Sequence, residues 1–192
     1  MPKVSSLCVA MNLVKKIEMA FARRCMPTEV IEPEQYIQFD SDVEEALWFA
    51  GRDWREITSK DWQDHSDAVH FLSPEAFAYY LPSLLILTIQ NPKGYPDMAV
   101  DPLIGKLDRS PSVEGWNDSF SRRFLGLSSE EYEAIKEWLL FACENIPQAF
   151  WGAAASGPGD GFGRTFDTVD LLQKETELRR MIDQEGSGIE SR

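Results

Sequence analysis

The residues best suited to chemistry in this sequence are its only two histidines, His65 and His70, which lie in a stretch rich in aspartate. Asp61 lies four residues before His65, and Asp67 lies three residues before His70, so each pair would share one face of a helix. A carboxylate beside an imidazole can orient a general base or help to ligate a metal ion. The spacing makes His65 and Asp61 the candidate catalytic residues of a hydrolase.

A structural alternative explains the same stretch without catalysis. His65 would pack with Trp62 against the longest helix, while the aspartates are solvated or cap a helix. Because the two histidines are five residues apart, they diverge by roughly 140° around a helix and cannot ligate one ion unless the helix breaks between them. We favour the structural alternative and expect no metal site and no cofactor.

No other motif supports catalysis. The glycine-rich stretch 157–163 lacks the lysine and the preceding strand of a phosphate-binding loop, and it is typical of a flexible linker. Cys143 lies at helical spacing beside an apolar face, which favours a buried structural thiol. No G-x-S-x-G motif is present, so a serine nucleophile of that kind is excluded.

The charge balance bears on the class of partner. The chain has 192 residues with 19 lysines and arginines against 32 aspartates and glutamates, a net charge of −13. This balance argues against an autonomous nucleic-acid binder and against docking on anionic lipid. Residues 41–75 carry three positive and nine negative side chains. The acidic excess favours a protein that presents an acidic surface to a basic protein partner.

Cysteine usage and hydropathy bear on the compartment. The three cysteines, Cys8, Cys25 and Cys143, are odd in number and form no C-x-x-C pair, which predicts reduced thiols in the cytoplasm. The apolar residues before Lys15 and Lys16 continue into a helical pattern rather than a signal-peptide cleavage site. No apolar run approaches the roughly 20 residues that span a bilayer, so we expect no membrane segment.

Apolar spacing and capping residues predict a single all-α domain of about six helices. Its centre is the helix from Ser73 to Gln90, which is apolar nearly all round and contains Pro82, where we expect a kink. Two capping boxes, Ser41 with Glu44 and Ser128 with Glu131, mark the starts of further helices. The other expected helices cover residues 4–25, 59–70, 116–125 and 167–184.

The remaining segments are expected to be irregular. The stretch 91–115 contains four prolines and reads as a long loop with, at most, one turn of helix at 102–107. We divide the chain into a helical domain, 1–150, and a loosely attached, flexible extension, 151–192. The extension would comprise a glycine-rich linker at 153–163, a polar helix and a disordered tail.

The sequence resembles a family of small uncharacterised bacterial proteins between Val14 and Asn145. The resemblance rests on a central block, F-L-S-P-E-A-F-A-Y-Y-L-P, at residues 71–82. It extends to the shorter motifs Ile17–Phe21, Gly51–Trp54 with Trp62 and His65, and Phe124–Ser128. The resemblance implies a cytoplasmic bacterial protein with a helical fold, and it implies no mechanism.

Two alternatives apply to the central block and to the tryptophans. Tyr79 and Tyr80 either pack in the core or line a gap at the kink together with His65 and Arg52. One or two of the six tryptophans at a surface groove would mark a recognition hot spot, whereas core packing explains most of them. The candidate binding residues are therefore Arg52, Trp54, Trp62, His65, Tyr79 and Tyr80.

The leading functional prediction is a non-enzymatic, acidic protein-binding module, comparable to the immunity proteins that neutralise basic toxins. The first alternative is the hydrolase that uses His65 and Asp61, with or without a metal. The second alternative is an assembly role, in which apolar and tryptophan-rich patches meet a second copy of the chain.

Overall fold

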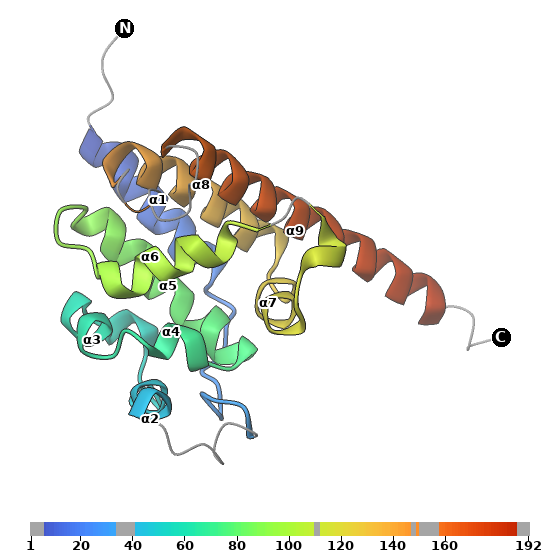
Figure 1. Cartoon of the computed structure of the whole chain (residues 1–192), viewed down its shortest axis with the longest axis horizontal. Coiled ribbons are helices and arrows are strands. Elements are labelled where there is room, and N and C mark those ends of the chain that lie inside the picture. The colour runs from blue at the N-terminus through green and yellow to red at the C-terminus, as the bar shows by residue number, and fades with distance from the viewer. Residues whose placement is uncertain (1–5, 34–40, 110–111, 147–148, 150–157, 188–192) are drawn as a thin grey trace, which may run out of the picture.

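The structure is a computed structural model that describes residues 6–33, 41–109, 112–146, 149 and 158–187 (Figure 1). These residues form helices, turns and loops, and their only β-type pairing is an isolated bridge between Ile31 and Leu72. The α-helices are α1 (Ser6–Ala20), α2 (Ser41–Leu47), α3 (Ser59–Asp64), α4 (Ala68–Phe71), α5 (Pro74–Gln90), α6 (Asp97–Leu107), α7 (Asp118–Phe124), α8 (Ser129–Asn145) and α9 (Pro158–Ser187). The prediction of an all-α fold is confirmed.

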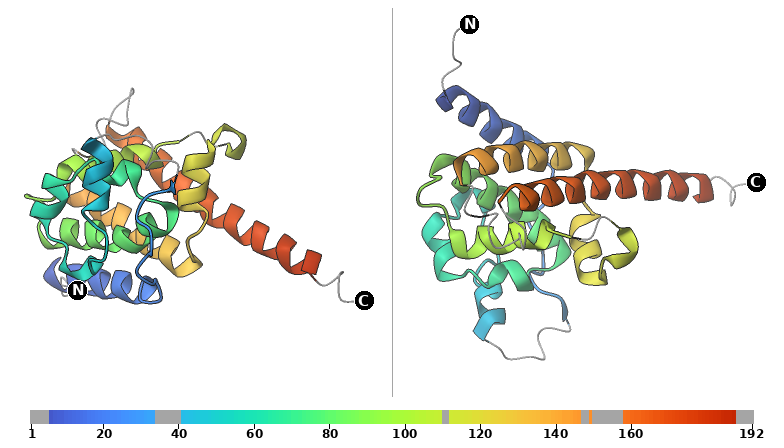
Figure 2. Two further views of the ribbon diagram at one scale, coloured as in Figure 1. Left: turned by 90° about the horizontal axis from the view of Figure 1, so that it is seen from below. Right: turned by 45° about the horizontal axis from the view of Figure 1, so that its top comes forward.

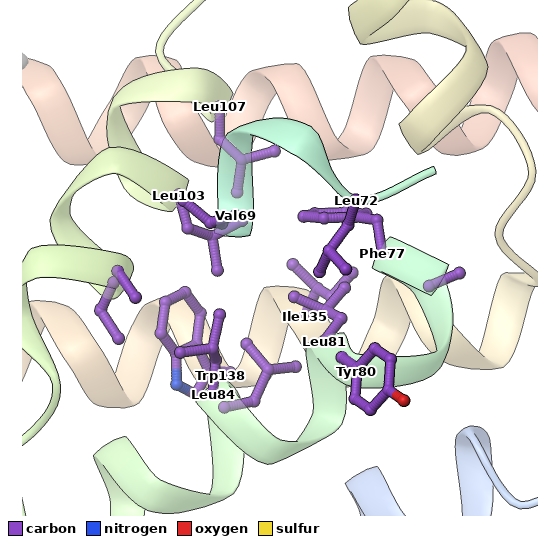
Figure 3. Packing of buried hydrophobic residues seen from close by; sticks show 14 of the residues in the cluster. Val69, Leu72, Phe77, Tyr80, Leu81, Leu84, Leu103, Leu107, Ile135 and Trp138 are labelled. Carbon is purple, nitrogen blue, oxygen red and sulfur yellow. The ribbon is translucent and has the colours of Figure 1, made fainter. Parts of the chain in front are cut away.

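Helix α5 is the buried centre of the molecule, as its all-round apolar sequence predicts. Ser73 caps it by accepting a hydrogen bond from the Ala76 N–H at 3.2 Å, and Pro74 occupies the first turn. The helix continues through Pro82 without interruption. Its side chains interleave with those of α6 and α8 around Trp138 (Figure 3).

Helix α8 begins at the predicted capping box. The Glu131 N–H donates to the Ser128 hydroxyl, and the Ser128 N–H donates to the Glu131 carboxylate, so both ends of the box are made. Its apolar stripe contacts α1, α5 and α9. Helix α1 is shorter than predicted, since it ends at Ala20 and a turn follows. The side chain of Ser41, half of the other predicted box, lies outside those described.

Helix α6 corrects the prediction of a long irregular loop. Eleven residues from Asp97 form a helix, and its buried stripe is Ala99, Val100, Leu103, Ile104 and Leu107. The four prolines of this stretch concealed that stripe in the sequence. Pro96 precedes the helix and Pro102 lies inside it, where burial of the apolar stripe outweighs the lost backbone hydrogen bond.

Helix α9 corrects the prediction of a linker, because the chain is helical from Pro158 through the glycines up to Gly163. Val169 and Leu172 are buried against the rest of the molecule, and α9 contacts α8 and α6. The first half of α9 is therefore part of the packed core, contrary to the prediction of a loose attachment. Its second half projects beyond the other helices (Figure 2). Residues 151–157 and 188–192 lie outside the described residues.

No helix among the described residues has the length and apolar content needed to cross a membrane.

Candidate functional site

Helices α2, α3 and α4 lie together at one end of the molecule, and a tight turn after α2 shapes this end (Figure 1). Gly51 has a φ of +72°, the left-handed conformation that glycine adopts without strain. The Tyr80 hydroxyl donates to the backbone carbonyls of Phe49, at 2.5 Å, and Arg52, at 3.0 Å. Through these hydrogen bonds, the central helix α5 holds the turn in position.

Three side chains stack at the surface of this end. The imidazole of His65 lies 4.4 Å from the ring of Trp48 with an interplanar angle of 22°. The guanidinium carbon of Arg52 lies 3.8 Å from the same ring, and its Nε donates to the Trp48 carbonyl at 2.7 Å. Two planar groups this close cannot share one face, so Trp48 lies between His65 and Arg52. We call these residues the Trp48 stack.

The position of His65 depends on a break in the predicted helix 59–70. Helix α3 ends before His65, whose backbone N–H donates to the Asp61 carbonyl at 3.0 Å. The chain then turns, and the Asp67 N–H donates to the Glu45 carboxylate of α2 at 2.9 Å. The prediction of one continuous helix over 59–70 is therefore wrong. The Asp67 N–H bonds to a side chain of α2 instead of to a carbonyl of its own helix, which interrupts the helical hydrogen bonding. His65 packs on Trp48, while His70 lies exposed on α4.

Asp61 serves as a helix cap. Its Oδ2 accepts hydrogen bonds from the Thr58 N–H at 2.8 Å and the Thr58 hydroxyl at 2.6 Å, which completes a capping box at the start of α3. Partial burial raises the pKa of Asp61, but the Thr58 hydrogen bonds outweigh it, so the pKa lies below its usual value. This geometry corresponds to the structural alternative for the aspartate, a cap, rather than to a base-orienting partner of His65.

Four of the predicted binding residues form the buried floor beneath the stack. Trp54, Trp62, Tyr79 and Tyr80 are only 3%, 1%, 4% and 0% exposed. Trp62 Nε1 donates to the Ser83 hydroxyl of α5 at 2.8 Å, so its polar group is already satisfied. Burial raises the pKa of Tyr80 to about 12, and its hydroxyl stays neutral as a donor. These side chains support the surface and cannot contact a partner directly.

Trp48 is the residue that the predicted binding set lacks. Of the five tryptophans that the structure describes, Trp48 alone is half-buried and the others are buried. Its contact with Arg52 spans the tight turn after α2 rather than one turn of helix, so helical spacing gave no signal for it in the sequence. Its contact with His65 joins two helices and has no local signal.

Exposed carboxylates surround this end of the molecule. Asp53 pairs with Arg55 at 3.3 Å, and Asp64 pairs with Lys60. Glu44, Glu56 and Asp67 are exposed, and within the described residues none of them has an ion-pair partner. The described part of the chain contains no group of three or more metal-ligating side chains that could hold an ion. The arrangement can attract and anchor a cationic partner.

Comparison with known proteins places the chain in a family. Residues 11–150 match the model of a family described as a family of unknown function, DUF6714. The chain belongs to this family. No curated protein and no solved structure matches it.

The DUF6714 match covers the whole of the stretch over which the sequence resembles a family without an assigned activity. It includes the α2–α4 end and every residue of the Trp48 stack. Helix α9 lies beyond the matched residues, although its first half is packed into the same core.

Proposed function

We propose that this DUF6714 protein is a non-enzymatic binding module whose α2–α4 end binds a basic protein partner. The Trp48 stack would be the anchor, and Glu44, Glu56 and Asp67 would supply the complementary charge. The protein would act in the bacterial cytoplasm, which suits three cysteines that form no disulfide.

The observation that carries the proposal is the Trp48 stack itself. Tryptophan and arginine are enriched among the residues that dominate interface energies, because they offer large, rigid contact areas. Here Arg52, Trp48 and His65 are already ordered by stacking, by the Arg52–Trp48 hydrogen bond and by the turn that Tyr80 fixes. A partner would therefore bind without ordering these side chains first, which reduces the entropic cost of association.

The unpaired carboxylates support a basic partner over a neutral one. Exposed charges of one sign accelerate the encounter with an oppositely charged surface, and salt weakens that attraction. His65 is stacked on Trp48 and Asp61 caps α3, and these structural contacts leave the hydrolase alternative with less support.

The test is capture of partners from host lysate at low and high salt, with identification by mass spectrometry. The informative variant combines Glu44→Gln, Glu56→Gln and Asp67→Asn, and no described side-chain hydrogen bond is lost in it. We expect the wild-type protein to retain a basic protein at low salt and to release it at high salt. The triple variant and Trp48→Ala should each retain at least tenfold less of the same protein.

A matched control carries the same change in net charge elsewhere. It combines Glu18→Gln, Asp118→Asn and Glu144→Gln, all at exposed positions outside the α2–α4 end. We expect it to retain the partner as the wild type does. If both triple variants lost the partner equally, the binding would depend on net charge alone and not on the α2–α4 end. Capture of an acidic partner, or of no partner, would contradict the proposal.

Self-association is a second candidate function, and one observation favours it. Leu178, Met181 and Ile182 have the spacing of one helical face on the projecting half of α9, and they are 48%, 56% and 59% exposed. Exposed apolar stripes of this kind mark association surfaces. We expect the mass measured by light scattering to rise with concentration for the wild type and not for Leu178→Gln with Ile182→Gln. The control pair is Val9→Gln with Leu140→Gln, and a wild type that stays monomeric would exclude this candidate.

A further inference from the structure

A small cavity between the end of α6 and α7 collects positive charge in an otherwise acidic protein. Its volume is about 90 Å³, and Lys106, Arg109 and Arg123 line it. The rest of the lining consists of Asn117, Ser119, Phe120 and Phe124, so none of the residues around the cavity is acidic.

The nearest carboxylate in sequence is already neutralised. Asp108 lies between Lys106 and Arg109 along the chain, but it forms a two-point ion pair with Arg164 of α9. The two bonds are 2.6 and 2.9 Å long. Burial lowers the pKa of Arg123, and Glu32, which pairs with Arg122, acts on Arg123 from a distance to oppose this lowering. Lys106 and Arg109 have no ion-pair partner among the described residues.

Backbone contacts hold the two arginines in place. Arg123 is buried and donates to the carbonyls of Val69, at 3.1 Å, and His70 at the end of α4. The Arg109 Nε donates to the Lys106 carbonyl at 2.9 Å, and its guanidinium carbon lies 5.1 Å from the Phe120 ring. These bonds leave the terminal nitrogens of Arg109 and the ammonium of Lys106 available to a ligand.

The cavity is an unfavourable environment for the charge of Lys106. Burial lowers the pKa of Lys106 to about 8, and repulsion by Arg123 and Arg109 adds to this effect. A cation that is desolvated beside two others without a carboxylate destabilises the fold. Side chains that are held apart from counter-charges at such a cost are typical of functional sites.

We propose that this cavity binds a tetrahedral oxyanion, the phosphate group of a small phosphorylated ligand or of inorganic phosphate. Lys106 and Arg109 would donate hydrogen bonds to the anion, the Ser119 hydroxyl at the rim would add another, and Arg123 would contribute charge from below. Guanidinium and ammonium groups are the usual partners of phosphate in proteins. The volume corresponds to about three water molecules, so it holds one phosphate group, and any organic part would extend past exposed Ser119.

The test measures calorimetric binding and thermal stability at pH 7 and low ionic strength with inorganic phosphate, sulfate and phosphoserine, and with acetate as a control anion. We expect phosphate to bind and to raise the melting temperature, and acetate to do neither. Stronger binding of phosphoserine than of phosphate would identify an ester as the ligand, and the reverse would identify the free ion.

The informative variant is Lys106→Met, which keeps the apolar stem and removes the charge. It should bind phosphate at least tenfold more weakly and, without phosphate, melt at a higher temperature than the wild type because the repulsion is gone. Arg109→Gln should weaken phosphate binding in the same way. This second variant separates a loss of the site from any change in folding caused by Lys106→Met. Lys93→Met is the matched control at an exposed site and should leave binding unchanged. Wild-type protein that binds acetate as well as phosphate, or none of the anions, would overturn the proposal, as would equal loss in Lys93→Met.

Discussion

The contact between Arg24 and Glu131 shows how one carboxylate serves both a helix end and a tertiary contact. Glu131 is buried and accepts from Arg24 Nε at 2.6 Å and Nη2 at 2.5 Å, and it also accepts from the Ser128 N–H at 2.6 Å. The bond to Glu131 raises the pKa of Arg24, so the pair stays ionised. The same side chain thus starts α8 and joins it to the segment that follows α1.

Glu131→Gln should be far more harmful than a comparable change at the surface. It leaves the half-buried Arg24 charge without a counter-charge and weakens the cap, so we expect a loss of about 2–3 kcal/mol in the free energy of unfolding. Glu137→Gln breaks the exposed pair with Lys16 and should cost under about 0.5 kcal/mol. Urea unfolding of both variants measures the difference, and similar losses would contradict it.

The lowered pKa of Lys106 predicts how anion binding depends on pH. Sulfate keeps its charge between pH 7.5 and 9.5, whereas Lys106, with a pKa of about 8, loses its proton within this range. Sulfate affinity should therefore fall as the pH rises. The charged groups that act on Lys106 are Arg123 and Arg109, whose guanidinium groups keep their charge over this range. Lys106→Arg should bind sulfate with a flat pH profile, and a wild-type profile equally flat would contradict the prediction.

At the scale of elements, substitution by alanine at two glycines with open space around them should change the stability of the fold in opposite directions. A methyl group at Gly51 or at Gly105 would meet no atom within 4 Å. Gly51 has a φ of +72°, so Gly51→Ala should cost about 1 kcal/mol through backbone strain alone. Gly105 lies inside α6, so Gly105→Ala should stabilise the protein by about 0.5–1 kcal/mol. Thermal unfolding of the pair tests this, and the same sign for both would be inconsistent with it.

The elements that the sequence predicted correctly are those with local signals. Ser73 with Pro74, and Ser128 with Glu131, are chemical caps that work within one turn of chain, so the starts of α5 and α8 were predictable. The break between α3 and α4 depends on Glu45 of α2, and α6 depends on burial of a stripe among prolines. The contact with Glu45 has no local signal in the sequence, and the four prolines conceal the apolar stripe of α6.

The candidate site divides in the same way. Arg52 and His65 were in the predicted set, but the sequence could not indicate that Trp48 lies between them. Tyr79 and Tyr80 face the core because α5 is buried on all sides, which the sequence favoured. The cationic cavity could not be predicted from a sequence of net charge −13, because it forms only where α6 and α7 meet in the fold.

For the molecule as a whole, the packed core includes residues beyond the end of the DUF6714 match. The match ends at residue 150, yet α9 contributes buried side chains from Thr165 to Thr176. The Thr176 hydroxyl bonds to that of Tyr132 at 2.8 Å, and Arg164 neutralises Asp108. The glycines at the start of α9 disfavour a helix by about 1 kcal/mol each, and packing against α8 and α6 outweighs this.

Removal of α9 should therefore do more than delete a tail. A chain shortened to residues 1–157 would expose the apolar faces of α8 and α6 that Val169 and Leu172 cover, and it would leave Asp108 without Arg164. We expect this chain to aggregate or to unfold without a cooperative transition, and to bind a dye specific for exposed apolar surface. A chain shortened to 1–184 retains every buried residue of α9 and should unfold within about 0.5 kcal/mol of the full chain. If chain 1–157 instead unfolded with the cooperativity of the full chain, α9 would be an attachment to a complete domain, and its packing would matter only for association.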